Sequence, residues 1–150
     1  MTPASHDGLS LGSSDELLPP PQEWPASYTA VTVPAHPDFV ASIRAMARAT
    51  AVLADLSLDD VEELQIAVDE AAALLLPLAD ASGRWLRARF EVESGRLVTK
   101  LDMSCRAGRG VDRSGLAWMM LTAIDPGVVV TEDGGTVTIT IVRGHGSSVP

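Results

Sequence analysis

Apolar residues recur every three or four positions between residues 57 and 78, which is the strongest periodicity in the chain and predicts an amphipathic helix. Ser57 precedes this segment as a helix cap would, and Asp59 and Asp60 fall in the first turn, near the positive end of the helix dipole. Pro77 is expected to kink or end the helix. The stripe consists of Val61, Leu64, Val68, Ala71, Leu75 and Leu78, widened by Ala67 and Leu74.

A second stripe at helical spacing predicts another helix over residues 37–53, with Pro37 in its first turn. This stripe consists of Phe39, Ile43, Met46 and Thr50. A third, short apolar helix is predicted over residues 115–124, with Ser114 as its cap.

Alternation of apolar and polar residues predicts strands over residues 86–92, 96–103 and 136–142, and β-branched runs predict two more over 28–33 and 128–131. Residues 93–95 and 133–135 hold the glycines of two turns, and the Gly- and Arg-rich residues 104–113 are predicted to form a loop. The resulting order, β-α-α-β-β-loop-α-β-β, predicts an α+β fold. We expect a two-layer sandwich, with helices on one face of a mixed or antiparallel sheet.

The two ends of the chain lack the apolar content of a packed core. Residues 1–26 are rich in Pro, Ser and acidic residues, and we expect a disordered arm there and a disordered tail over residues 144–150. The folded domain is therefore predicted to span residues 27–143.

The net charge of −9 is unevenly distributed and argues against direct nucleic-acid binding. Residues 1–70 hold two arginines against twelve acidic residues, whereas residues 71–150 hold nine basic against eight acidic residues. No apolar run is long enough to span a bilayer, and the N-terminus has no secretory pattern. With Cys105 as the single cysteine, these features favour a reducing cytoplasm.

Three strings in this order resemble the GHKL (histidine-kinase-like) ATPase superfamily. Residues 64–71, LQIAVDEA, resemble its N-box helix; residues 115–124, GLAWMMLTAI, resemble the helix after its second Gly box; and residues 134–139, GGTVTI, resemble its Gly-Thr turn and closing strand. The likeness covers roughly residues 28–143. It is greatest to the RsbW-like branch of anti-sigma factors and serine-protein kinases, especially the actinobacterial sigma-F-type regulators of stress responses.

The resemblance implies a nucleotide site, and four positions match it: Glu70, Gly115, Gly135 and Thr136. The family's Asn that holds magnesium on ATP lies four residues after the N-box Glu, where this chain has Leu74. An isobutyl group cannot ligate a cation that requires oxygen. We therefore treat Glu70 as the remnant of a general base, now capping or salt-bridged within the fold. We expect no magnesium and no required cofactor; residual ATP binding stays open.

The family's Asp-x-Gly-x-Gly box is also altered, and two alignments stay open. If Asp102 is the box acid, Ser104 and Arg106 replace its glycines; if Met103 occupies the acid's position, the acid itself is missing. Ala117 replaces a glycine of the second Gly box. The nucleotide motifs are thus degenerate, which is typical of a pseudokinase.

The first functional hypothesis is an anti-sigma factor that sequesters an alternative sigma factor from RNA polymerase and releases it by partner switching with a STAS anti-anti-sigma factor. A second is an active serine-protein kinase that phosphorylates the STAS partner, and a third is a scaffold that binds no sigma factor. The resemblance further implies a homodimer. It also points to the first helix as a contact region, where Arg44 and Arg48 are the candidate interface residues.

Other candidate chemistry is weaker. The three histidines show no metal-ligand spacing, so no metal site is predicted. Cys105 lies near Arg106 and Arg109, which could lower its thiol pKa, but an idle thiol is the simpler interpretation. Trp118, Met119 and Met120 suit either core packing or an adaptable partner surface.

Overall fold

The computed structural model of the chain describes residues 28–81 and 84–144. The arm predicted over residues 1–26 lies outside the described residues. So does the predicted tail, apart from Gly144, which is the last residue of the last strand.

Within the described ranges, five strands form one sheet in the order β1-β2-β3-β5-β4. Every neighbouring pair is antiparallel, which decides between the two sheet types that the sequence left open. The strands are β1 (Tyr28–Pro34), β2 (Trp85–Glu93), β3 (Arg96–Ser104), β4 (Val129–Asp133) and β5 (Thr136–Gly144).

Two tight turns set the register of the β2–β3 and β4–β5 hairpins. Ser94 and Gly95 join β2 to β3 with φ angles of 46° and 77°, and Gly134 and Gly135 join β4 to β5 with φ angles of 55° and 82°. Two successive residues with positive φ are the signature of the turn whose twist matches that of the flanking strands. Each of these two hairpins is therefore held in one alignment.

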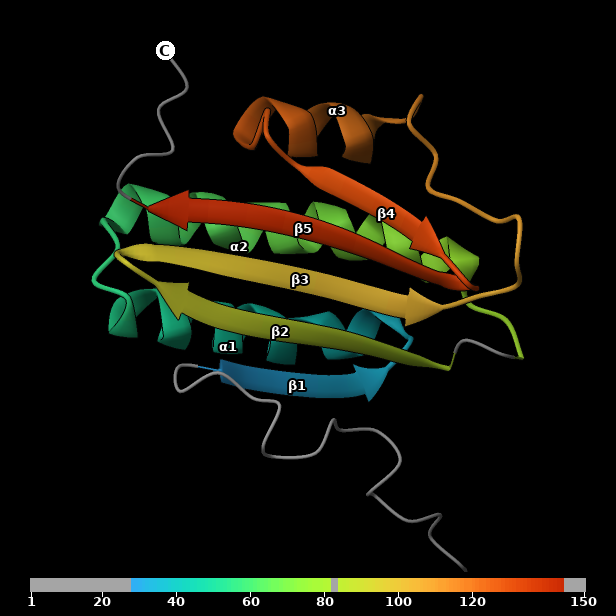
Figure 1. The fold of residues 1–150 in the computed structure, drawn as a ribbon, viewed down its shortest axis with the longest axis horizontal. Coiled ribbons are helices and arrows are strands. Elements are labelled where there is room, and N and C mark those ends of the chain that lie inside the picture. The colour runs from blue at the N-terminus through green and yellow to red at the C-terminus, as the bar shows by residue number, and fades with distance from the viewer. Residues whose placement is uncertain (1–27, 82–83, 145–150) are drawn as a thin grey trace, which may run out of the picture.

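The helices are α1 (Val40–Leu53), α2 (Leu58–Leu75) and α3 (Leu116–Ile124), with short 3-10 turns at Pro37–Phe39 and Leu76–Leu78. Figure 1 shows α1 and α2 behind the sheet, with α3 beside α2 near the β4 edge. The predicted α+β, two-layer architecture is confirmed. None of the helices in the described part of the chain is both long and apolar enough to cross a membrane.

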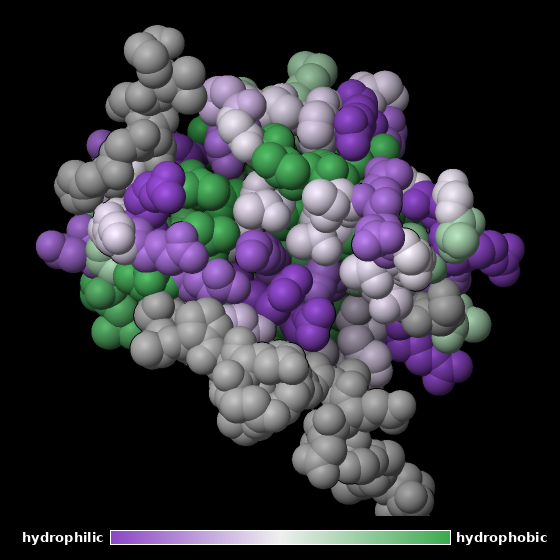
Figure 2. All heavy atoms as spheres, in the orientation of Figure 1, coloured by the Kyte–Doolittle hydropathy of each residue, from purple (hydrophilic) through white to green (hydrophobic). Residues whose placement is uncertain are grey.

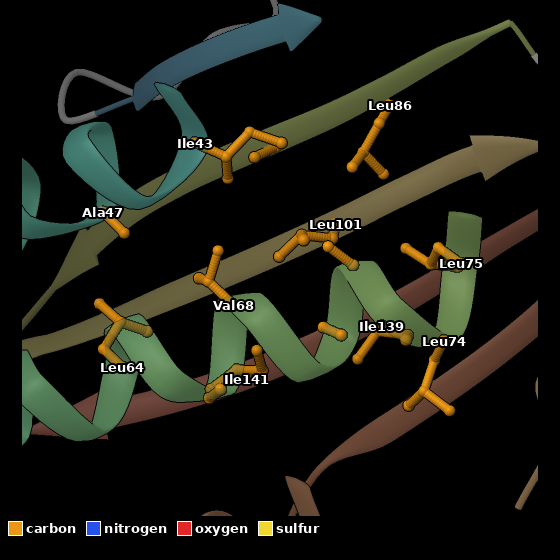
Figure 3. Close-up of a cluster of buried hydrophobic side chains, with 14 of the residues drawn as sticks. Ile43, Ala47, Leu64, Val68, Leu74, Leu75, Leu86, Leu101, Ile139 and Ile141 are labelled. Carbon is orange, nitrogen blue, oxygen red and sulfur yellow. The ribbon is translucent and has the colours of Figure 1, made fainter. Parts of the chain in front are cut away.

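The core lies between the sheet and α2. All members of the predicted α2 stripe are buried, against alternate residues of β2, β3 and β5. Figure 3 shows Leu64, Val68 and Leu75 of α2 facing Leu101 and Ile139 of the sheet.

Three local expectations met different outcomes. The side-chain oxygen of Ser57 accepts a hydrogen bond from the Asp60 N–H and caps α2 as predicted, and α2 ends just before Pro77 in a 3-10 turn. The predicted cap at Ser114 was wrong, because Gly115 is the cap residue of α3. Phe39 is 43% exposed and lies outside the buried face of the first helix, because a 3-10 turn over Pro37–Phe39 precedes α1 and shifts its angular position.

Candidate functional site

The position that would hold magnesium in the resembling family is filled by a buried hydrocarbon side chain. Leu74, in the last turn of α2, is 5% exposed and belongs to the hydrophobic core (Figure 3). Glu70 precedes it by one turn and is half-buried. Among the described residues, the Glu70 carboxylate has no hydrogen bond or ion pair, so its predicted capping or salt-bridging role is not observed.

The register of β3 places the candidate acid on the face of the sheet away from the helices. Asp102 pairs with Arg87 of β2 and Thr138 of β5, whereas the next residue, Met103, turns its side chain toward the helices and is buried. Met103 therefore occupies the helix-facing position. At this position of β3, no acidic side chain faces the helices, the side on which Glu70 and Leu74 lie.

Asp102 instead forms an ion-pair cluster on the open face of the sheet. Its carboxylate is 3% exposed and accepts hydrogen bonds from Arg87 Nε at 2.9 Å and from Arg89 Nη2 at 3.3 Å. The hydrogen bond to Asp102 raises the pKa of Arg87. Figure 2 shows this face, where hydrophilic side chains gather across the middle of the sheet. The cluster links β2 to β3 by charge-assisted hydrogen bonds.

Two of the four family-matching positions line a shallow pocket at the end of the sheet. Gly135 and Thr136 border a cavity of about 300 Å³ with the loop that follows β3, which includes Cys105 and Arg106. The Cys105 N–H donates to the Gly135 carbonyl at 2.7 Å, and a Cβ on Gly135 would lie 3.1 Å from the Cys105 carbonyl oxygen. This hydrogen bond fixes the loop against the turn.

Glu70 and Gly115 are not among the residues that line this cavity, so the structure does not gather the four matching positions around one pocket. Gly115 caps α3 with its backbone, and a Cβ there would lie 3.2 Å from the Asp112 carboxylate. Asp112 in turn accepts hydrogen bonds from the N–H and hydroxyl of Ser114, which lower the pKa of the Asp112 carboxyl.

The residues present do not fit a magnesium-bound nucleotide. A hard cation requires several oxygen ligands at fixed positions. On the side of the sheet that faces the helices, Leu74 and Met103 offer only carbon and sulfur atoms. Asp102 of β3 lies on the opposite face of the sheet, where its carboxylate pairs with arginines. Among the described residues, no group of three or more His, Cys, Asp and Glu side chains is placed to hold a metal ion.

The predicted interface arginines differ in their surroundings. Arg44 of α1 donates from Nη1 to both oxygens of Asp69 on α2, at 2.9 and 2.8 Å, and so links the two helices. The pair borders a groove of about 340 Å³ between α1 and α2. Arg48, one turn later, is exposed and makes no ion pair with a described residue. Arg48 is therefore the more available of the two for a partner.

Cys105 is buried at 5% exposure, and the loop that follows it is held by hydrogen bonds from Arg106 and Arg109. The Arg106 backbone N–H donates to Asp80, and Arg109 donates from Nη2 to the Pro77 carbonyl. A buried thiol of this kind packs as a small apolar group.

Sequence reasoning underestimated the exposed surface of α3. Its outer face is apolar, with Leu116, Met119 and Met120 at 68%, 61% and 39% exposure. The signal that could have revealed it is the complete absence of charged residues from the helix, because such a helix is ordinarily surrounded by protein.

No protein-family model and no curated protein matches the chain. Among solved structures, the chain is similar to the RsbU and RsbW domains of Rv1364c from Mycobacterium tuberculosis. The TM-score is 0.58 at 18% sequence identity, and the match covers 80% of this chain and 33% of that one. The chain thus spans about a third of the structure it matches. The likeness supports an RsbW-like fold.

Proposed function

We propose that the chain is an anti-sigma factor that holds an alternative sigma factor away from RNA polymerase by binding alone. The observation that carries this proposal is an RsbW-like fold in which the metal-ligand position is the buried Leu74. The fold supports a role in partner switching. Leu74 favours a mechanism by binding over one by phosphoryl transfer.

Phosphoryl transfer depends on positioned phosphates and on neutralisation of their charge. A carboxylate such as Glu70 can accept a proton, yet a base without a held phosphate supplies little of the rate enhancement. The buried Leu74 and Met103 offer neither charge nor oxygen to a nucleotide. The chain therefore acts as a pseudokinase, without ATP as a required cofactor.

The mechanism is mutually exclusive binding. A STAS anti-anti-sigma factor competes with the sigma factor for the chain, and the ratio of the two affinities sets how much sigma factor is free. Control then lies in the abundance of the partner or in its modification by another kinase. These events take place in the cytoplasm, where RNA polymerase acts.

The experiment is affinity purification of the tagged full chain from its native host, followed by identification of the bound proteins by mass spectrometry. We expect one alternative sigma factor, recovered in competition with a STAS protein. Recovery of STAS proteins without any sigma factor would favour the scaffold. Transfer of labelled phosphate to a STAS protein, abolished by Glu70→Ala, would establish the kinase instead.

A further inference from the structure

The two edges of the sheet differ in how well the open face, the face away from the helices, is covered. Thr32 of β1 and Thr131 of β4 lie at opposite edges of the sheet, in line with Asp102. Thr32 is half-buried and Thr131 is exposed, although both are on the open face. The large arginine side chains beside β1 account for part of this difference. Figure 1 shows α1 and α2 behind the sheet, so neither helix accounts for the rest.

Two polar atoms on the β1 side of the open face are shielded from water. Thr32 Oγ1 and Arg89 Nε are buried, and neither forms a hydrogen bond with a described residue. A buried N–H group without an acceptor is costly, and such groups are nearly always paired in folded proteins. Arg89 therefore calls for an acceptor that the described residues do not supply.

The charges around Arg89 indicate what kind of acceptor this is. Three cations of β2 and β3, Arg87, Arg89 and Lys100, pair with two carboxylates, Glu91 and Asp102. One positive charge is thus in excess here, in a chain whose net charge is −9. A carboxylate would balance this charge and accept a strong hydrogen bond from the guanidinium.

The N-terminal arm, residues 1–26, brings carboxylates to this edge of the sheet. It holds four acidic residues and no Lys or Arg. The arm leads into β1 at Tyr28, which pairs with Glu91 and lies on the open face. Arg89 is one strand across and two residues along from Tyr28, a distance of about 8 Å. Glu23 precedes Tyr28 by five residues, which span up to about 17 Å when extended. Its carboxylate is therefore within reach of Arg89.

We propose that the N-terminal arm folds back over the β1 side of the open face, where the Glu23 carboxylate accepts a hydrogen bond from Arg89. The arm then competes with any partner of this face, because the partner has to displace the arm before it can bind. This inference goes beyond the proposed function and does not depend on it. A second copy of the chain is the alternative occupant that the test distinguishes.

The test uses the full chain and its single lysine, Lys100, which lies opposite Arg89 on the open face. A water-soluble carbodiimide joins the lysine amine to a carboxylate in contact with it, by an amide bond formed with loss of water. Mass spectrometry of the peptides identifies the acid that is joined. We expect a cross-link to Glu23, beside one to Glu91, whose Oε1 lies 3.7 Å from the Lys100 Nζ. In a mixture of isotopically labelled and unlabelled chain, the cross-link to Glu23 should join residues of the same chain.

Arg89→Gln removes the cation and should lower the yield of the Lys100–Glu23 cross-link several-fold, as should a high salt concentration. Arg48→Gln is the matched control, because Arg48 is exposed on α1 in the helix layer and undergoes the same chemical change. The cross-link from Lys100 to Glu91 should persist in both variants, which would show that the strands still pair.

Three results would overturn the proposal: no cross-link between Lys100 and the arm, equal yields in Arg89→Gln and Arg48→Gln, or a cross-link between labelled and unlabelled chains. The last result would identify a second copy as the occupant of the open face. None of them changes whether a sigma factor is recovered from the host, so this proposal and the anti-sigma proposal fail separately.

Discussion

At the scale of the residue, Leu74 connects stability with function. Its side chain lies in the core between α2 and the sheet, where an amide would lose water without gaining a partner. The same burial places carbon where the resembling family has a metal ligand. In the proposed function, the residue that stabilises the fold is also the one that removes the nucleotide chemistry.

Restoring the family's amide should not restore nucleotide binding. We expect neither the natural chain nor Leu74→Asn to bind a fluorescent ATP analogue with magnesium, because Met103 still lacks the acid on the helix-facing side. The substitution should lower the free energy of unfolding by about 3 kcal/mol. Urea denaturation measures this loss, with the exposed Leu53→Asn as the control. Tight magnesium-dependent binding by the natural chain would refute this account of Leu74.

Tyr28 offers a titration that reports on the open face of the sheet. Burial raises the pKa of its hydroxyl, an effect that Arg89 partly opposes. A pKa raised in the folded state means that the neutral form stabilises the protein below about pH 10 and that this contribution is lost as the pH rises through the folded value. Because the chain has one tyrosine, its ultraviolet titration is specific. We expect the midpoint of this titration to lie at a higher pH in the folded protein than in the protein unfolded in urea. Equal midpoints would contradict the burial of the Tyr28 hydroxyl.

At the scale of the element, the two helix starts show what local sequence can predict. Ser57 was correctly predicted as a cap, because it is followed by acidic residues and a long periodic stripe that fixes the first turn. Ser114 has the same residue type but no acid in the helix after it, and Asp112 takes its hydroxyl instead. Competition from this carboxylate, two residues away in the chain, is a local contact that the periodicity of apolar residues does not encode.

This difference predicts unequal costs for the same substitution. Ser57→Ala should lower the free energy of unfolding by about 1 kcal/mol, because it removes the acceptor for the Asp60 N–H. Ser114→Ala should change it by less than about half of that, since the hydroxyl bonds only to an exposed side chain. Chemical denaturation of both variants measures the difference. Equal losses would show that Ser114 also caps its helix.

At the scale of the whole molecule, the sequence predicted the layers better than the site. Alternation identified the strands and their inward residues, but it did not specify which alignment of the Asp102 region the sheet would adopt. That choice depends on pairing β3 with β2 and β5, which places Arg87 opposite Asp102 on the neighbouring strand. Likewise, the apolar composition of residues 115–124 predicted the helix α3. Which side of α3 is exposed could not be predicted in this way, because it depends on where α2 ends and where β4 lies.

The proposed function depends on binding without nucleotide, so the most direct test is the affinity of the purified chain for the sigma factor recovered from its host. Isothermal titration calorimetry would compare this affinity in magnesium and ATP with that in EDTA without nucleotide. We predict the same Kd under both conditions, because the buried Leu74 and the outward Asp102 provide no magnesium site. Binding that requires ATP, or no binding at all, would contradict the proposal.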